Sequence, residues 1–279
     1  MQEIQLRECI REAVCRARER KPLVPSLTNA VTVSLVANAQ LAVGGSAAMF
    51  CLPDEGETMA QAGDAMYVNL GTMLPVHAET VPRTVRVLLE TRTPWVLDPV
   101  GIGFGELRRE LLLGFQQYRP SIVRGNASEM LALARLWGLD SGDSRGTHGI
   151  DSLDEVEDAR GAAIAIARFL GGAVAVSGKV DLVTDGKQVA YLEGGSPLME
   201  RMTGAGCSLG GVCAVFLAVS DPFVAALAGT AMYNVAGMLA EREAKAPASF
   251  QATFLDNLYL MKEEEAAGCP MRLERAEEK

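Results

Sequence analysis

The sequence predicts an α/β fold in which a mostly parallel central sheet carries helices on both faces and an antiparallel hairpin at its edge. Short apolar runs recur along the chain and alternate with amphipathic stretches of helical period, a pattern typical of parallel strands buried on both faces. Residues 180–194 instead show two short strands around Asp185-Gly186, which is a hairpin turn signal. With 279 residues, of which 49% are hydrophobic, the chain is long enough for a single domain over 1–279 with a sizeable core.

Each element follows from its local pattern. The chain opens on an amphipathic helix over 3–20, which Lys21-Pro22 ends. Strands are predicted over 47–52, 65–70, 94–100, 121–125 and 173–178. Helices are predicted over 31–43, 75–90, 106–118, 127–137 and 154–170 and, after the hairpin, over 206–219, 222–243 and 251–264. The remaining tail is expected to fray, and the Gly-, Ser- and Asp-rich segment 138–153 is expected to form a loop that serves as a lid or a mobile connector.

Charge and composition argue against several classes of function. A net charge of −9 excludes a general nucleic-acid or anionic-membrane surface, since either needs clustered Lys and Arg. No secretory signal pattern opens the chain and apolar windows such as 209–219 are too short to span a bilayer, so we expect a cytoplasmic protein. The six cysteines form no C-x-x-C pair and are expected to be free thiols. With His77 and His148 as the only histidines, a Ser-His-Asp triad or a multi-histidine metal site is not expected.

Polar side chains gather at places where a predicted strand ends or a helix begins. Asp98 follows the strand in VLDPVGIGFG, Arg124 and Glu129 lie in VRGNASE, Ser177 lies in VSGKVDLVTDG, and TGAGCSLGG opens a helix. In an open parallel sheet, ligands bind beyond the carboxyl ends of the strands. We therefore expect these four segments to form one shared site.

The glycine run 204–211 is typical of an anion-binding helix start, because free amides and the helix dipole favour negative charge there. The alternative is close packing of the helix on a sheet, in which Gly210 and Gly211 are simply contacts. Cys207 falls in the first turn, where the dipole is expected to lower the pKa of its thiol and make it a proton acceptor or a polar contact for a substrate hydroxyl. A buried, inert cysteine is the alternative.

The other polar residues also allow two interpretations. Asp98 is expected to point into the cleft, where it helps to hold Mg²⁺ through water or orients a substrate. Asn126 and Glu129 have the spacing of a helix capping box, which competes with a binding role for Glu129. Arg124 at a strand end needs a carboxylate or phosphate partner. Ser177 fits a nucleotide contact and a hydroxyl bonded to its own loop equally well.

Two nucleotide-binding motifs are rejected. GGAVAVSGKV, residues 171–180, imitates a Walker A loop, but its glycine spacing is one residue too long and Val180 stands where Ser or Thr is needed. GIGFG, residues 101–105, is half of a dinucleotide fingerprint and lacks the third glycine and the later acidic residue.

Six segments carry a family resemblance: LTNAVTVSLVANAQLAVGGSAAM, VNLGT, PWVLDPVGIG, IVRGNASEM, VAVSGKVDLVTDG and MTGAGCSLGG. In this order and at these separations they resemble the hydroxyethylthiazole kinase family of the ribokinase-like superfamily. The resemblance runs over residues 22–260, and RGNASE and TG-x-GC are its most specific parts.

The resemblance implies a ribokinase-like fold and an ATP- and Mg²⁺-dependent kinase that phosphorylates the primary alcohol of 4-methyl-5-(2-hydroxyethyl)thiazole in thiamine salvage. It places Cys207 where other superfamily members carry the aspartate base of a GAGD-like motif, and it makes Gly204, Ala205 and Gly206 an amide anion hole. Because phosphoryl transfer depends mainly on positioning and charge neutralisation, it demands little strength of this base.

The same resemblance implies roles for the remaining residues and an assembly. Arg124 and Ser177 are the expected ATP contacts, and Asp98 and Glu129 fit the metal and phosphate shell. The expected thiazole contacts are Met49, Gly204 and Asn29. The family pattern also implies a homotrimer whose thiazole sites lie between subunits.

The sequence departs from the family pattern at two positions. Ala47 replaces a proline in GGSAAM, so the loop before Met49 is expected to be less rigid, and Ser177 replaces a threonine while keeping the hydroxyl. Two alternatives stay open: a kinase of the same superfamily that acts on another small ring alcohol, such as hydroxymethylpyrimidine, and a non-catalytic thiazole or nucleotide sensor.

Overall fold

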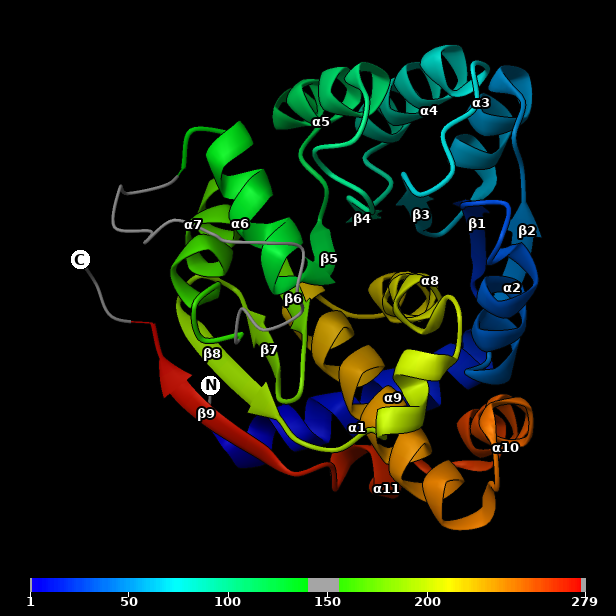
Figure 1. Ribbon diagram of the computed structural model, residues 1–279, viewed down its shortest axis with the longest axis vertical. Helices are drawn as coiled ribbons and strands as arrows, with labels where there is room; N and C mark the ends of the chain where they lie inside the picture. The colour runs from blue at the N-terminus through cyan, green and yellow to red at the C-terminus, as the bar shows by residue number, and fades with distance from the viewer. Residues whose placement is uncertain (1, 140–155, 277–279) are drawn as a thin grey trace.

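A nine-stranded sheet runs through the computed structural model, which describes residues 2–139 and 156–276 (Figure 1). The strand order is β2-β1-β3-β4-β5-β6-β7-β8-β9. The parallel strands are β1 (Leu23–Leu27), β2 (Ser46–Met49), β3 (Met66–Asn69), β4 (Trp95–Asp98), β5 (Ile122–Asn126) and β6 (Ala173–Ser177). The antiparallel strands are β7 (Asp181–Thr184), β8 (Gln188–Leu192) and β9 (Met271–Arg275). The predicted mixed sheet with an antiparallel hairpin is confirmed.

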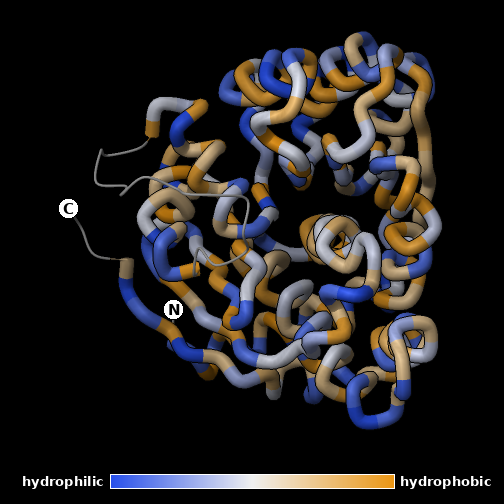
Figure 2. Tube along the Cα trace, viewed as in Figure 1, coloured by the Kyte–Doolittle hydropathy of each residue, from blue (hydrophilic) through white to orange (hydrophobic). Residues whose placement is uncertain are grey.

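Helices cover both faces of the sheet, as predicted. One face carries α1 (Glu3–Arg20), α2 (Val33–Ala42), α8 (Ala205–Leu217), α9 (Pro222–Glu243), α10 (Pro247–Leu260) and α11 (Glu263–Ala267). The other carries α3 (Pro53–Ala62), α4 (His77–Thr91), α5 (Glu106–Tyr118), α6 (Ala127–Leu136) and α7 (Arg160–Leu170). Because successive strand residues point to opposite faces, Val96 joins the first core while Trp95 and Leu97 join the second. Along α4 and α5, hydrophobic and hydrophilic residues alternate, as expected of helices with one solvent face (Figure 2).

Helix α9 has its predicted bounds and is longer than the apolar window 209–219 considered in the sequence. By length and hydropathy it is the one helix among the described residues that could cross a membrane. However, 89% of its most apolar window is buried inside the protein. It is therefore the central helix of the first core, where it packs against α8 and α10.

Two elements near the start of the chain were not predicted. β1 was missed because its sequence LVPSL contains Pro25, which argues against an interior strand. α3 was missed because PDEGETMAQA is polar and short, with Pro53 at its first turn as its main helix signal. Of the two, β1 positions the site, since it carries the chain to Asn29.

The C-terminal region also differs from the prediction. The helix expected over 251–264 is two helices, α10 and α11, and the tail expected to fray contains β9, which pairs with β8 as the outermost strand. The helix expected over 154–170 begins at Arg160. The predicted loop over 138–153 lies almost entirely outside the described residues.

Candidate active site

The predicted site residues come together at the carboxyl ends of the parallel strands. Asn69 ends β3 opposite Asp98 at the end of β4, and Asn126 on β5 is paired with Ser177 at the end of β6. Helix α8 begins beside these strand ends, because its glycines contact side chains of β3 and β5. The four segments therefore meet as predicted, at the edge where open parallel sheets bind ligands.

Asp98 and Arg124 form a buried ion pair at the centre of this edge. Asp98 is fully buried and Arg124 is 7% exposed, and Nη1 of Arg124 lies 3.4 Å from Oδ2 of Asp98. Nη2 of Arg124 donates to Oγ of Ser177 at 2.8 Å, so this hydroxyl belongs to the site. Burial raises the pKa of Asp98 to about 6, and Arg124 opposes the shift.

Two polar atoms of the ion pair have no partner. Oδ1 of Asp98 and Nε of Arg124 are buried and make no hydrogen bond with the described residues. Leaving one such atom unpaired costs about 1–3 kcal/mol. A lone carboxylate oxygen fits a cation or its water, and a lone guanidinium N–H fits a phosphate oxygen.

The acidic residues fit Mg²⁺ that is bound largely by its substrate. Within residues 2–139 and 156–276, no group of three or more His, Cys, Asp and Glu side chains is placed to hold a metal. Mg²⁺ commonly takes only one or two protein carboxylates and completes its shell with water and substrate phosphates. Oδ1 of Asp98 suits that role.

Glu129 makes the helix cap that competed with its predicted binding role. Its Oε2 accepts from the amide of Asn126 at 2.9 Å, and Oδ1 of Asn126 accepts from the amide of Glu129 at 2.9 Å, which completes a capping box on α6. The carboxylate still lies close enough to raise the pKa of Asp98. Its role toward a metal stays a prediction.

The glycines of α8 make room for side chains of the sheet. A Cβ on Gly206 would lie 2.5 Å from Nη1 of Arg124, and a Cβ on Gly210 would lie 2.4 Å from Cε2 of Tyr67. Gly211 packs against Val36 of α2 in the same way. The packing interpretation therefore describes Gly210 and Gly211, whereas Gly206 brings the start of the helix onto the buried arginine.

The predicted anion hole is only partly free. Gly204 precedes α8 with a φ of 89°, the left-handed region that favours glycine. The amides of Gly204, Gly206 and Cys207 donate to no acceptor among the described residues. The amide of Ala205 donates to the carbonyl of Met202 at 3.1 Å, so its predicted place in the hole is wrong, because the turn that starts the helix already uses it.

The sulfur of Cys207 lies in the first turn of α8 and accepts a hydrogen bond from Nδ2 of Asn29 at 3.3 Å. Two residues predicted separately, the thiol and a pocket asparagine, thus meet. Burial raises the pKa of Cys207 and Asp98 raises it further, while Arg124 opposes them. The predicted lowering of this pKa is wrong, because desolvation of the thiol outweighs the helix start.

The remaining predicted thiazole residues lie on the α2 side of the site. A Cβ on Gly204 would lie 2.4 Å from Cγ2 of Thr32, three residues after Asn29. Met49 ends β2, is half-buried, and packs against the same core as Cys207. Their contacts with a thiazole stay predictions.

Sequence reasoning missed Tyr67 and Asn69. Tyr67 donates its hydroxyl to Oδ2 of Asp98 at 2.9 Å, and Nδ2 of Asn69 donates to the same oxygen at 3.1 Å. Asn69 ends an apolar strand just as Asp98 does, and this signal was available in AMYVNL. Tyr67 carried no signal, because an aromatic residue inside a strand is normally core.

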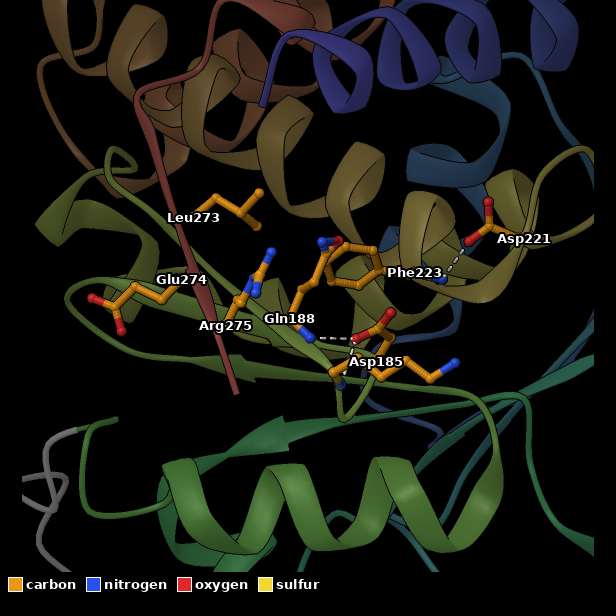
Figure 3. A pocket seen from close by; sticks show the side chains of 8 residues that line it. Asp185, Gln188, Asp221, Phe223, Leu273, Glu274 and Arg275 are labelled. Carbon is orange, nitrogen blue, oxygen red and sulfur yellow. Dashed lines mark hydrogen bonds between the residues drawn. The ribbon is translucent and has the colours of Figure 1, made fainter. Parts of the chain in front are cut away.

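A surface cleft of about 540 Å³ lies elsewhere, at the opposite end of the sheet (Figure 3). It is lined by the β7–β8 turn, the start of α9 and β9. Asp185 accepts from the amides of Lys187 and Gln188, and Asp221 caps α9, so both carboxylates already serve the fold. Because β7 runs antiparallel to β6, this turn faces away from Ser177 and the cleft is no part of the predicted site.

The architecture is that of the ribokinase-like kinases. The pyridoxal kinase from Staphylococcus aureus in complex with AMP-PCP and pyridoxal has a TM-score of 0.63 at 15% identity, covering 91% of this chain and 98% of that one. This likeness defines the fold, which places the site at the strand ends where open parallel sheets bind ligands.

The sequence narrows the class to one family. The model of the Hydroxyethylthiazole kinase family matches residues 14–264, and the chain therefore belongs to that family and is a kinase. A hydroxyethylthiazole kinase from Bifidobacterium animalis subsp. lactis is 47% identical over 96% of this chain and 92% of the relative, and one from Tolumonas auensis is 39% identical over 88% and 91%. The structure of the hydroxyethylthiazole kinase protein from Pyrococcus horikoshii has a TM-score of 0.86 at 31% identity, covering 95% of this chain and 99% of that one.

Proposed function

We propose that this chain transfers the γ-phosphoryl group of ATP to the primary hydroxyl of 4-methyl-5-(2-hydroxyethyl)thiazole, a step of thiamine salvage. The observation that carries the proposal is the convergence of Cys207, the free amides at the start of α8 and the Asp98–Arg124 pair. Gly206 is pressed against Arg124, so the start of α8 and the guanidinium border one region, to which we assign the transferred phosphoryl group. Cys207 borders the same region from the side of Asn29.

The described residues divide the work of phosphotransfer. Arg124 and Ser177 bind ATP, and the orphaned Nε of Arg124 is a donor for a phosphate oxygen. Amides of α8 stabilise the negative charge on the transferred group. Mg²⁺ would be held through Asp98, with Glu129 nearby, and when bound it neutralises charge on the phosphates.

Cys207 is the catalytic residue that faces the alcohol. Because burial raises the pKa of its thiol from 9.0, the sulfur is protonated at neutral pH. We assign to it the orientation of the accepting hydroxyl, whose proton passes late in a loose transition state to an oxygen of the transferred phosphoryl group, so the thiol itself takes no proton.

The alcohol is bound on the α2 side of α8. Asn29 and Gly204 border this region, and Met49 lies at the end of β2 next to β1. A thioether is a suitable neighbour for an aromatic sulfur heterocycle, because it is polarizable and adapts to ring edges.

We also propose a cytoplasmic homotrimer with thiazole sites between subunits. β2 is the edge strand of the sheet, and Val31 and Leu41 nearby are 71% and 53% exposed. Proteins usually cover an edge strand, and a subunit placed here would also contact the end of β2 at Met49. Light scattering should give three times the chain mass of 29.7 kDa, and a monomer mass at assay concentration would contradict the shared site.

The substrate assignment is tested by turnover. Purified protein is incubated with ATP and Mg²⁺ and either the thiazole alcohol or hydroxymethylpyrimidine, and the phosphorylated product is identified by mass spectrometry. We expect turnover of the thiazole alcohol. Turnover restricted to the pyrimidine would replace the substrate, and binding of the alcohol without product in any mixture would indicate a sensor.

A further inference from the structure

The side chain of Asn69 uses all four of its hydrogen-bonding positions inside the site. Its Nδ2 donates to the hydroxyl of Tyr67 at 2.8 Å and to Oδ2 of Asp98 at 3.1 Å. Its Oδ1 accepts from the amide of Gly71 at 2.9 Å and from Nδ2 of Asn29 at 3.2 Å. Since a backbone amide can only donate, Gly71 fixes which end of the Asn69 amide faces Asp98.

The two carboxylate oxygens of Asp98 therefore differ in their hydrogen-bond partners. Oδ2 accepts hydrogen bonds from Tyr67, Asn69 and Arg124, whereas Oδ1 accepts none from the described residues. Three donors on one oxygen fix the plane of the carboxylate. The other oxygen is left for a ligand.

The side-chain oxygen of Asn69 is connected to the thiol of Cys207 through Asn29. Asn29 donates with one Nδ2 to Oδ1 of Asn69 and to Sγ of Cys207. A continuous chain of hydrogen bonds therefore runs from Asp98 through Asn69 and Asn29 to Cys207. It joins the side of the site that we assign to the phosphate with the side that we assign to the alcohol.

We propose that Asn69 is a positioning residue for the phosphotransfer and that Tyr67 braces it. Asn69 sets the orientation of Asp98 directly and that of Cys207 through Asn29, and Tyr67 acts on the Asp98 end alone. The inference rests on the roles proposed above for Asp98 and Cys207. Residues that orient a binding carboxylate from behind typically change activity about 10- to 100-fold when removed.

A purely structural role is the competing explanation. Tyr67 and Asn69 are both buried, and any buried polar group needs partners whether or not it serves the reaction. A structural role predicts a loss of stability that leaves the kcat of the folded enzyme unchanged. A positioning role predicts an effect on kcat that disappears when that carboxylate is removed.

The experiment is therefore a double-mutant cycle on kcat. Tyr67→Phe and Asn69→Ala are each made in the wild type and in Asp98→Asn, and thermal melts confirm that every variant is folded at the assay temperature. Tyr233→Phe is the matched control, because this tyrosine is also fully buried but its hydroxyl makes no hydrogen bond with Asp98 or Asn69. Tyr67→Phe keeps the shape of the ring and tests the proposal even if Asn69→Ala does not fold.

We expect Tyr67→Phe to lower kcat about 10-fold and Asn69→Ala about 100-fold, with Tyr233→Phe unchanged. In Asp98→Asn, Tyr67→Phe should change kcat less than about 2-fold, and the effect of Asn69→Ala should shrink. If Tyr67→Phe and Asn69→Ala keep the wild-type kcat while Asp98→Asn is impaired, the positioning role alone is overturned. The same holds if each double variant loses the product of the two single-variant losses in kcat. Wild-type kcat in Asp98→Asn would overturn the proposed role of Asp98 as well.

Discussion

Cys207 shows how burial sets the chemistry of one side chain. The helix start that surrounds it would by itself favour a thiolate, yet burial and the Asp98 carboxylate raise the pKa of the thiol. The sulfur is therefore suited to holding a hydroxyl in place rather than to removing its proton. This distinction can be tested at the level of the single residue.

Cys207→Ala should lower kcat about 10- to 100-fold without abolishing ATP binding, because the sulfur orients the hydroxyl and is not asked for the roughly 100-fold or more that a general base contributes. Arg124, Ser177 and the amides remain in place. Cys207→Asp should stay active, because a carboxylate is the base that the superfamily pattern places here. Steady-state kinetics from pH 6 to 9 and calorimetric ATP titrations measure both variants.

Cys213→Ala is the control for that comparison. Cys213 lies on the same helix and is fully buried in the core, so its removal should leave kcat unchanged. Full activity of Cys207→Ala at every pH would remove the sulfur from the mechanism.

Asp181 provides a pH-dependent prediction at a single residue. Burial raises the pKa of this carboxyl from 3.8 to about 6 in the folded chain, although its Oδ1 accepts from the amide of Gly178 at 2.9 Å. Between these two values the folded state binds a proton that the unfolded state has lost. The contribution of Asp181 to stability therefore falls as the pH rises through this window.

Asp181→Asn keeps the acceptor for Gly178 and removes the charge. The variant should be more stable than the wild type at pH 7.5 by about 1 kcal/mol, after allowance for partial solvent screening, which corresponds to roughly 2–4 °C in Tm. The gain should vanish at pH 4, where Asp181 is protonated in the folded wild type. Thermal melts of both proteins from pH 4 to 7.5 measure this difference. An equal gain in Tm at both pH values would contradict the raised pKa of Asp181.

The residues that could be predicted are those whose position at a strand or helix end carried the signal. Asp98, Arg124, Ser177 and Cys207 all follow this pattern and meet at one site. The pKa of Cys207 and the use of the Ala205 amide could not be predicted, because both depend on what packs around the turn. The role of Tyr67 could not be predicted for the same reason, since only the fold turns its hydroxyl toward Asp98.

At the scale of the element, the glycines of α8 determine how closely this helix packs on the sheet. Gly210 admits the ring of Tyr67 and Gly206 admits the guanidinium of Arg124, so the helix lies closer to β3 and β5 than larger residues would allow. Glycine inside a helix costs about 0.5–1 kcal/mol relative to alanine. Close packing on the sheet must offset that cost.

Gly210→Ala should destabilise the protein by about 1–3 kcal/mol, because the new methyl group would overlap Tyr67 and displace it or the helix. Displacement of Tyr67 should lower kcat as well, since its hydroxyl is bonded to Asp98. Gly114→Ala is the matched control: this glycine lies inside α5 and a Cβ there meets no atom within 4 Å.

The control should be neutral or stabilised by about 0.5–1 kcal/mol through helix propensity alone. Thermal melts and kcat measured on both variants separate packing from propensity. A stabilised and fully active Gly210→Ala would mean that Tyr67 is not confined by the helix.

The elements that escaped prediction share a physical cause. β1 contains a proline, α3 has little apolar pattern, and three of the five residues of β9, MRLER, are charged. Each is held by pairing or packing with segments far away in the chain rather than by local preference. The long helices α1 and α9 were predicted to their ends.

At the scale of the whole molecule, the two ends of the chain secure the sheet far from the active site. β9 pairs with β8 along its full length, and the amide of Ala276 donates to the carbonyl of Lys187 at 2.9 Å. Arg7 on α1 donates to the carbonyls of Ala267 and Cys269 at 2.6 and 2.9 Å, just before β9 begins. The first helix and the last strand thus form one closing unit.

Ending the chain after Pro270 should therefore cost stability without touching the site. Loss of the β8–β9 ladder and its packing should destabilise the fold by about 2–4 kcal/mol, or roughly 5–15 °C in Tm. It also exposes β8 as an unpaired edge, which should promote association between molecules.

A chain that ends after Ala276 keeps every β8–β9 pair and should melt and elute as the full chain does. Melts, light scattering and kcat at a temperature where both chains are folded make the comparison. An unchanged Tm and mass after the longer truncation would show that β9 contributes nothing to the sheet, whereas a loss of kcat in the folded molecule would show that the two ends of the sheet are coupled.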